Sequence, residues 1–201
     1  MTEAIIISWP HDFDDPDATE IVALSTDNIP IKGIRTENEP WTANEWVIPT
    51  TFVVTVTGLF FKSFFEEAGK DAYQTLKAHI NEYLAKRRQI KTQLITSDQS
   101  PDKLSKSYDQ SMSISLKARL HTGVLVNVLF SNKVKEKDVR AMLEGMSQNL
   151  ELMYRNCQKQ APEEHINYEK RPHEVYLVVN PETKKWEVLS PKEMSDRYRN
   201  T

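Results

Sequence analysis

A group of carboxylates near the N-terminus has the spacing that most resembles a metal or catalytic site. The segment His11–Asp17 reads HDFDDPD, and its acidic members are Asp12, Asp14, Asp15 and Asp17. Carboxylate oxygens are the ligands that hard cations such as Ca²⁺ and Mg²⁺ prefer. The EF-hand pattern fails, because counted from Asp12 its sixth position is Asp17 instead of glycine and its twelfth is Ala23 instead of glutamate. A solvated turn is therefore favoured over a metal site. Metal-assisted catalysis by residues 11–20 is kept as the weakest of three functional hypotheses.

Other catalytic patterns are absent from the sequence. No two of the five histidines have HxxxH or HExxH spacing, and no G-x-S-x-G elbow or glycine-rich phosphate loop occurs. The single Cys157 lies on an apolar face of an expected helix, which favours a buried thiol over a nucleophile. The sequence therefore favours a non-catalytic protein over an enzyme and predicts no cofactor.

Charge and composition limit the classes of partner. The 201 residues carry a formal net charge of −3, which disfavours nucleic-acid binding through phosphate neutralisation. A basic cluster at Lys86, Arg87, Arg88 and Lys91 could contact phosphate or an anionic head group, but a cationic helix C-terminus is the commoner role. The N-terminal residues lack the pattern of a secretion signal, and one cysteine fits a reducing compartment. These features predict a cytoplasmic protein.

The stretch Trp46–Arg88 is the most apolar part of the chain, and it is expected to organise the rest. Apolar residues recur at steps of three or four between Phe61 and Tyr83, which predicts an amphipathic helix. The β-branched run Thr51–Thr57 favours a strand by local propensity, but its apolar residues also keep a helical step. We expect a helix from about Thr50 to Arg88, with a kink near Gly58 or Gly69.

The remaining periodicity predicts an α+β fold. The expected sheet is mainly antiparallel, with two long helices packed on it and a C-terminal β-hairpin followed by a short helix. A single domain, 1–201, is expected, with a soft boundary near residue 89. The expected elements are strands Ala4–Trp9, Ile29–Arg35 and Ile90–Thr96, a strand or helix at Ala18–Leu24, a hairpin of Met112–Leu120 with Val124–Phe130, a helix ending near Gln160, a hairpin of Glu174–Val179 with Trp186–Leu189, and a helix from Pro191.

Two further functional hypotheses depend on residues 46–65, which hold one charge, Lys62. The first is a protein-interaction or self-association module that binds a partner protein or forms a homo-oligomer, because this segment is more apolar than a surface helix needs to be. Its candidate contact residues are Trp46, Phe52, Leu59, Phe60, Phe61 and Phe64. The second is a membrane-acting effector that inserts the same segment; its length suits a bilayer, but its threonines make it a poor span.

Overall fold

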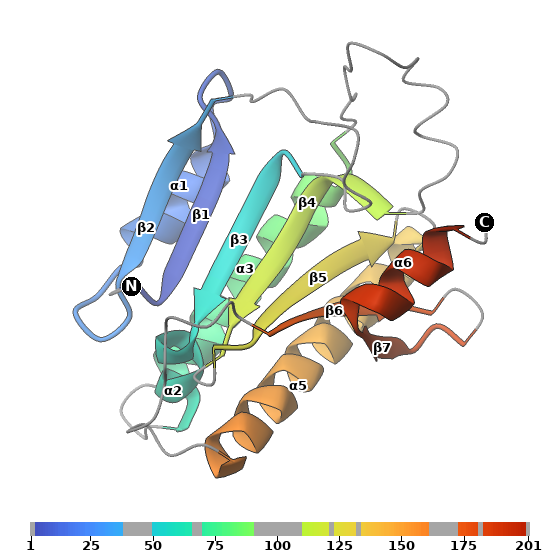
Figure 1. Cartoon of the computed structure of the whole chain (residues 1–201). Coiled ribbons are helices and arrows are strands. Elements are labelled where there is room, and N and C mark those ends of the chain that lie inside the picture. The colour runs from blue at the N-terminus through green and yellow to red at the C-terminus, as the bar shows by residue number, and fades with distance from the viewer. Residues whose placement is uncertain are drawn as a thin grey trace.

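The fold is built on one seven-stranded mixed sheet (Figure 1). The computed structural model describes residues 3–37, 50–65, 70–90, 110–120, 123–131, 134–160, 173–180 and 183–199. Across the sheet the strand order is β2-β1-β3-β4-β5-β6-β7. The strands are β1 (Ile5–Pro10), β2 (Ile31–Thr36), β3 (Phe52–Thr57), β4 (Gln110–Arg119), β5 (Leu125–Ser131), β6 (Glu174–Val179) and β7 (Trp186–Leu189).

Helices cover the two faces of the sheet unequally. Helices α1, α3 and α5 lie behind the sheet in Figure 1, whereas α6 crosses the opposite face over β6 and β7. The main core lies between the sheet and the layer formed by α1, α3 and α5, and a small second cluster lies between the sheet and α6. The helices are α1 (Pro16–Ala23), α2 (Gly58–Phe65), α3 (Lys70–Arg88), α5 (Glu136–Gln160) and α6 (Pro191–Arg199).

The chain contains three successive β-α-β units, and this arrangement corrects the expected sheet. Helix α1 connects the parallel pair β1–β2, helices α2 and α3 lie between the parallel strands β3 and β4, and α5 connects the parallel pair β5–β6. Neighbouring units join through antiparallel pairs, and β7 closes the edge antiparallel to β6. The sheet is therefore mixed, with three parallel pairs, and the prediction of a mainly antiparallel sheet was wrong. Strands on either side of a crossover helix run parallel, which periodicity within one element does not reveal.

The expected kinked helix from Thr50 to Arg88 was wrong in its first part, whereas the residues from Gly58 to Phe65 and from Lys70 to Arg88 are helical. Residues Phe52–Thr57 form the inner strand β3, in which Phe52, Val54 and Val56 are buried at alternate positions. Helix α2 begins only at Gly58, so the chain changes direction where a kink was expected. The second row of β3 side chains, Val53, Thr55 and Thr57, is β-branched but not buried throughout. Phe52 and Val56 lie four residues apart, so the same run also satisfies a helical step.

Most other elements agree with the sequence-based expectations. The strand near Ile5, the edge strand near Ile31, the β4–β5 hairpin, the long α5, the β6–β7 hairpin and the short α6 are confirmed. The segment Ala18–Leu24 is the helix α1, capped by Asp15, whose side chain accepts a hydrogen bond from the Ala18 amide. The expected strand Ile90–Thr96 lies outside the described residues except for Ile90, which is not in a strand.

Candidate functional site

The predicted contact residues of the apolar segment lie mainly in the core. Phe52 contacts Phe13 edge to face, with ring centroids 5.2 Å apart, and Phe61 stacks on Tyr154 at 5.1 Å. Phe60 is buried with them, whereas Leu59 is 36% exposed. Trp46 and the Phe64 side chain lie outside the described residues. The described aromatic residues of this segment therefore hold the chain together and do not form a free surface.

The acidic loop meets the basic end of α3. Asp15 is 1% exposed, and its carboxylate accepts hydrogen bonds from the Tyr83 hydroxyl at 2.9 Å and from the Arg87 guanidinium. The Arg87 guanidinium carbon also lies 4.9 Å from the centroid of the Tyr83 ring. Burial, followed by the charge of Asp15, raises the pKa of the Tyr83 hydroxyl above its usual value. Burial lowers the pKa of Arg87, but the bonds and charge of Asp15 outweigh it and leave that pKa raised.

The other loop carboxylates are either paired with cations of the chain or exposed. Asp17 binds Lys86 at 2.8 Å and Arg87 at 2.8 Å, and the hydrogen bond from Lys86 is the main cause of its lowered pKa. Asp12 and Asp14 are exposed. Within the described ranges, no three side chains of His, Cys, Asp or Glu gather closely enough to hold a metal ion. Asp15 and Asp17 are bound by the chain's own cations.

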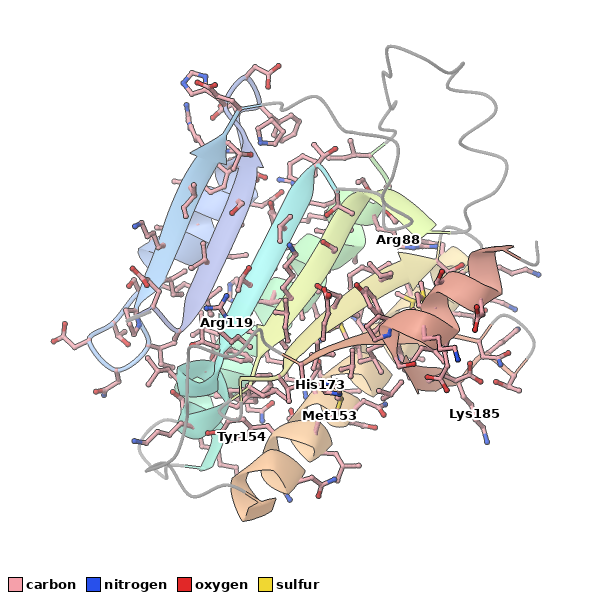
Figure 2. All side chains as sticks on the ribbon, viewed as in Figure 1. Arg88, Arg119, Met153, Tyr154, His173 and Lys185 are labelled. Carbon is pink, nitrogen blue, oxygen red and sulfur yellow. The ribbon has the colours of Figure 1, made fainter. Side chains whose placement is uncertain are left out.

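The basic cluster at the end of α3 is likewise occupied. Lys86 and Arg87 are paired with the acidic loop, and the Arg88 guanidinium donates to the main-chain oxygens of Ser131 and Val134. Figure 2 shows Arg88 beside the end of β5, as these bonds require. The fourth member, Lys91, lies outside the described residues. These arginines join α1, α3 and the start of α5, and they are not available to an external phosphate.

A groove beside the start of α5 is the strongest candidate for a binding site. It has a volume of about 680 Å³ and lies between α5 and the β6–β7 hairpin. This volume is within the range of sites that hold ligands. A second cavity, between α2, α3 and α5, measures only about 20 Å³. The groove is lined by Ser131, Val134, Lys135, Asp138, Ala141, Met142, Gly145, Asn149, Val179, Asn180, Lys184, Lys185 and Trp186.

Trp186 forms the apolar floor of this groove and is fixed in place. Its indole nitrogen donates a hydrogen bond of 2.9 Å to the main-chain oxygen of Met142, and its ring meets Phe130 edge to face at 6.4 Å. A Cβ atom added to Gly145 would lie 3.2 Å from both Cδ1 and Nε1 of this indole. Glycine inside a helix costs about 1 kcal/mol relative to alanine. The glycine in α5 therefore has a packing reason, which is to seat the indole.

The apolar surface continues beyond the groove along both of its walls. On α5, residues 138, 141, 145, 149 and 152 follow one another at steps of three or four and share one side of the helix. Leu152, at the far end of this row, is 57% exposed. On β7, Val188 lies two residues after Trp186, which places both on the same face of the strand, and it is 49% exposed. Both walls therefore present large apolar side chains to solvent.

One end of the groove is basic. Lys135, Lys184 and Lys185 are exposed members of its lining, and Asp138 is the only carboxylate among the lining residues that the structure describes. Figure 2 shows Lys185 at the margin of the molecule beside the β6–β7 hairpin. No ion pair joins any of the three lysines to a carboxylate in the part of the chain that the structure describes.

The sequence-based reasoning missed this groove. Its residues come from β5, α5, β6, β7 and the segments that connect them, and none belongs to a recognisable motif. Two signals were present, namely a glycine inside the strongly periodic α5 and a tryptophan opening the edge strand β7. Neither signal indicates that the two residues touch, because their contact depends on the parallel pairing of β5 with β6.

Comparisons with known proteins found no matching protein-family model, curated protein or solved structure. Among the described helices, none combines the length and apolar character needed to cross a bilayer.

Proposed function

We propose that this protein is a non-catalytic interaction module that binds an amphipathic helix of a partner protein in the groove between α5 and the β6–β7 hairpin. The single observation that carries the proposal is this groove, with Trp186 as its fixed floor. The proposal keeps the interaction module expected from the sequence but uses another surface, because Phe52, Phe60 and Phe61 are core residues.

The layering of the fold supports a helix as the occupant. Helices α1, α3 and α5 cover successive parts of one sheet face (Figure 1). At the end of this cover, α5 contacts β7 at Trp186 but leaves Val188 49% exposed. Sheet faces are normally buried against a further layer. Val188 and the half-buried Trp186 lie at this end of the layer. A helix placed beside α5 would continue the layer and shelter both side chains.

The length of the groove also suits a short helix. Its lining on α5 extends from Asp138 to Asn149, eleven residues apart, which corresponds to about 16 Å of helix axis at about 1.5 Å per residue. Three turns of a partner helix would therefore span it, with apolar residues at i, i+3, i+4 and i+7 against the floor.

Neither alternative function gains support from the described residues. Residues 52–57 are a strand inside the sheet, and the following helix has only eight residues, so segment 46–65 is not one inserting helix. In the acidic loop, Asp15 and Asp17 are engaged by Tyr83, Lys86 and Arg87. The membrane and metal-assisted hypotheses stay untested predictions.

The test uses a displayed library of 16-residue peptides with a fixed apolar helical stripe and random polar positions. Selected peptides are labelled, and their affinities are measured by fluorescence anisotropy. We expect Ala141→Tyr, which adds bulk at an exposed groove position, to weaken binding about tenfold, since a misplaced ring costs on the order of 1–2 kcal/mol. Ala72→Tyr, the same change at an exposed position of α3, should leave binding unchanged.

Light scattering on the same variants identifies the partner. A monomer that binds selected helices supports the proposal. A dimer that Ala141→Tyr dissociates and Ala72→Tyr does not would assign the groove to a second copy of this chain, which is self-association. Binding that Ala141→Tyr and Ala72→Tyr affect equally, or no selected binder, would overturn the assignment of the groove.

A further inference from the structure

We infer that the partner helix carries carboxylates at the end that lies against Lys135, Lys184 and Lys185; this inference rests on the proposed function of the groove. The three lysines are all at one end of the lining, where β5 and β6 finish and α5 begins. The other end is lined by Ala141, Met142, Gly145 and Asn149 beside Trp186. The site is thus divided into a cationic end and an apolar body.

None of these three lysines has a carboxylate partner among the described residues, whereas two lysines of α3, Lys77 and Lys86, do. Lys77 lies 3.1 Å from Glu151 and 3.3 Å from Glu144, and Lys86 lies 2.8 Å from Asp17 and 3.0 Å from Glu82. Among the described lining residues of the groove, Asp138 is the one carboxylate beside three ammonium groups. Complementary charge on a partner raises association rates and selects between partners.

The hairpin holds two of the three lysines in a defined position. The Lys184 amide donates to the Asn180 oxygen at 2.8 Å, and the Asn180 amide donates to the Lys185 oxygen at 2.8 Å. Thr183 adds a further bond from its amide to the Asn180 side chain at 3.0 Å. Lys184 has a φ of +57°, a left-handed conformation that usually favours glycine. The backbone that carries the cationic pair is therefore organised before any partner arrives, which reduces the ordering required on binding.

The shape of the charge pattern favours an acidic helix over a nucleic acid. A nucleic acid carries charge along its whole length and is bound by cations spread along its path. Here the cations lie at one end of an apolar groove, in a chain whose formal net charge is −3. A helix with an apolar stripe and an acidic terminal turn matches both halves of the site.

The test compares designed 16-residue helices that share one leucine stripe. One pair carries Glu-Glu in the first or the last turn, and the matched pair carries Gln-Gln at the same positions. In the expected result, the better acidic peptide binds about tenfold more tightly than its glutamine counterpart at low salt, and the difference shrinks as salt is raised. The affinity of a 12-nucleotide single-stranded nucleic acid is measured alongside those of the peptides.

Two protein variants locate the effect. Lys135→Glu with Lys185→Glu should remove the preference for the acidic peptide and leave the glutamine peptide's affinity nearly unchanged. Lys32→Glu with Lys70→Glu makes the same change in net charge at exposed sites on β2 and at the start of α3, and it should keep the preference.

The outcomes separate the inference from the proposed function. Equal binding of the acidic and glutamine peptides, still blocked by Ala141→Tyr, would overturn the acidic partner and keep the groove. No groove-dependent binding of any designed or selected helix would overturn both. Tighter binding of the single strand than of every peptide, lost in the Lys135→Glu and Lys185→Glu variant, would reassign the groove to nucleic acid.

Discussion

Charged side chains are paired with one another near α1 and α3, but the three lysines of the groove near α5 and β7 have no carboxylate partner among the described residues. At the α1–α3 end, Asp15 and Arg87 are buried against each other, and Asp17 holds Lys86 at the surface. At the α5–β7 end, three lysines lie at one end of an apolar groove, and no described carboxylate pairs with them. Both regions would be described from sequence alone as clusters of charge beside apolar residues.

The comparison teaches that pairing, more than the number of charges, distinguishes a structural cluster from a binding surface. In the first region, the buried Arg87 guanidinium replaces lost water with carboxylate oxygens of the same chain, and Lys86 pairs with Asp17 at the surface. The cluster thus joins elements that are about 70 residues apart. In the second region, the cations remain solvated beside exposed apolar side chains. Such a combination suits a partner that brings its own carboxylates.

The largest effect on stability is expected when the Asp15–Arg87 pair between α1 and α3 is broken. Arg87→Met leaves the Asp15 carboxylate buried without its cation, so the free energy of unfolding should fall by about 3–5 kcal/mol. Urea denaturation followed by circular dichroism measures this change. Adding Asp15→Asn to Arg87→Met should recover part of the loss, because the stranded charge is removed.

A loss below about 1 kcal/mol for Arg87→Met would show that water reaches Asp15 and that the pair resembles a surface ion pair. The matched variant Lys86→Met removes an exposed partner of Asp17 and should cost no more than about 1 kcal/mol. A similar loss in the two variants would contradict the contrast between the buried and the exposed pair.

An intermediate effect on stability is expected at the contact between Gly145 and Trp186 in the groove. Gly145→Ala improves helix propensity by about 1 kcal/mol, but the new Cβ meets the Trp186 indole at 3.2 Å, so most of that gain should disappear. In a Trp186→Leu background the same change should give the full gain. Urea denaturation of the four proteins gives a coupling energy, which we expect to be about 0.5–1 kcal/mol. Strict additivity would show that the indole does not rest on residue 145.

The smallest effect is a dependence on pH at the surface of the paired end. The folded-state pKa of Asp17 is lowered from its ordinary 3.8, chiefly by the hydrogen bond from Lys86. Stability from this group is therefore present above pH 3.8 and is lost as the pH falls through the lower, folded-state pKa. Asp17→Asn should lose stability at neutral pH and differ less from the parent protein as the pH falls below about 4. Denaturation at pH 7 and pH 3 measures this; an equal difference at both values would remove Asp17 as the source.

Much of the fold could be predicted from local pattern. The alternation in β4, the glycine turn after it and the apolar row in α5 predicted those elements within a few residues. The pattern was misinterpreted at β3, because Phe52 and Val56 are four residues apart and therefore also fit a helical step, although the β-branched run favours a strand. Strand direction was also mispredicted. The direction of β6 relative to β5 depends on the crossover helix α5 that connects them, and the residues within either strand do not reveal it.

The candidate site could hardly be predicted at all. The sequence drew attention to Phe60 and Phe61, whose apolar character reflects the needs of the core. It also drew attention to Asp15 and Arg87, but their mutual contact depends on placing α1 beside α3. The groove needs the register of β6 with β7 and the position of α5, and both are properties of the whole sheet.

The close contact between Trp186 and Gly145 should restrict how these two positions vary during evolution. Any Cβ at position 145 begins 3.2 Å from the indole, so a larger side chain there requires a smaller one at position 186 or a shifted helix. In homologous chains the two positions should consequently change together, with glycine retained wherever tryptophan is kept. That pairing, 41 residues apart along the chain, offers a signature by which distant members of the lineage could be found in genomes.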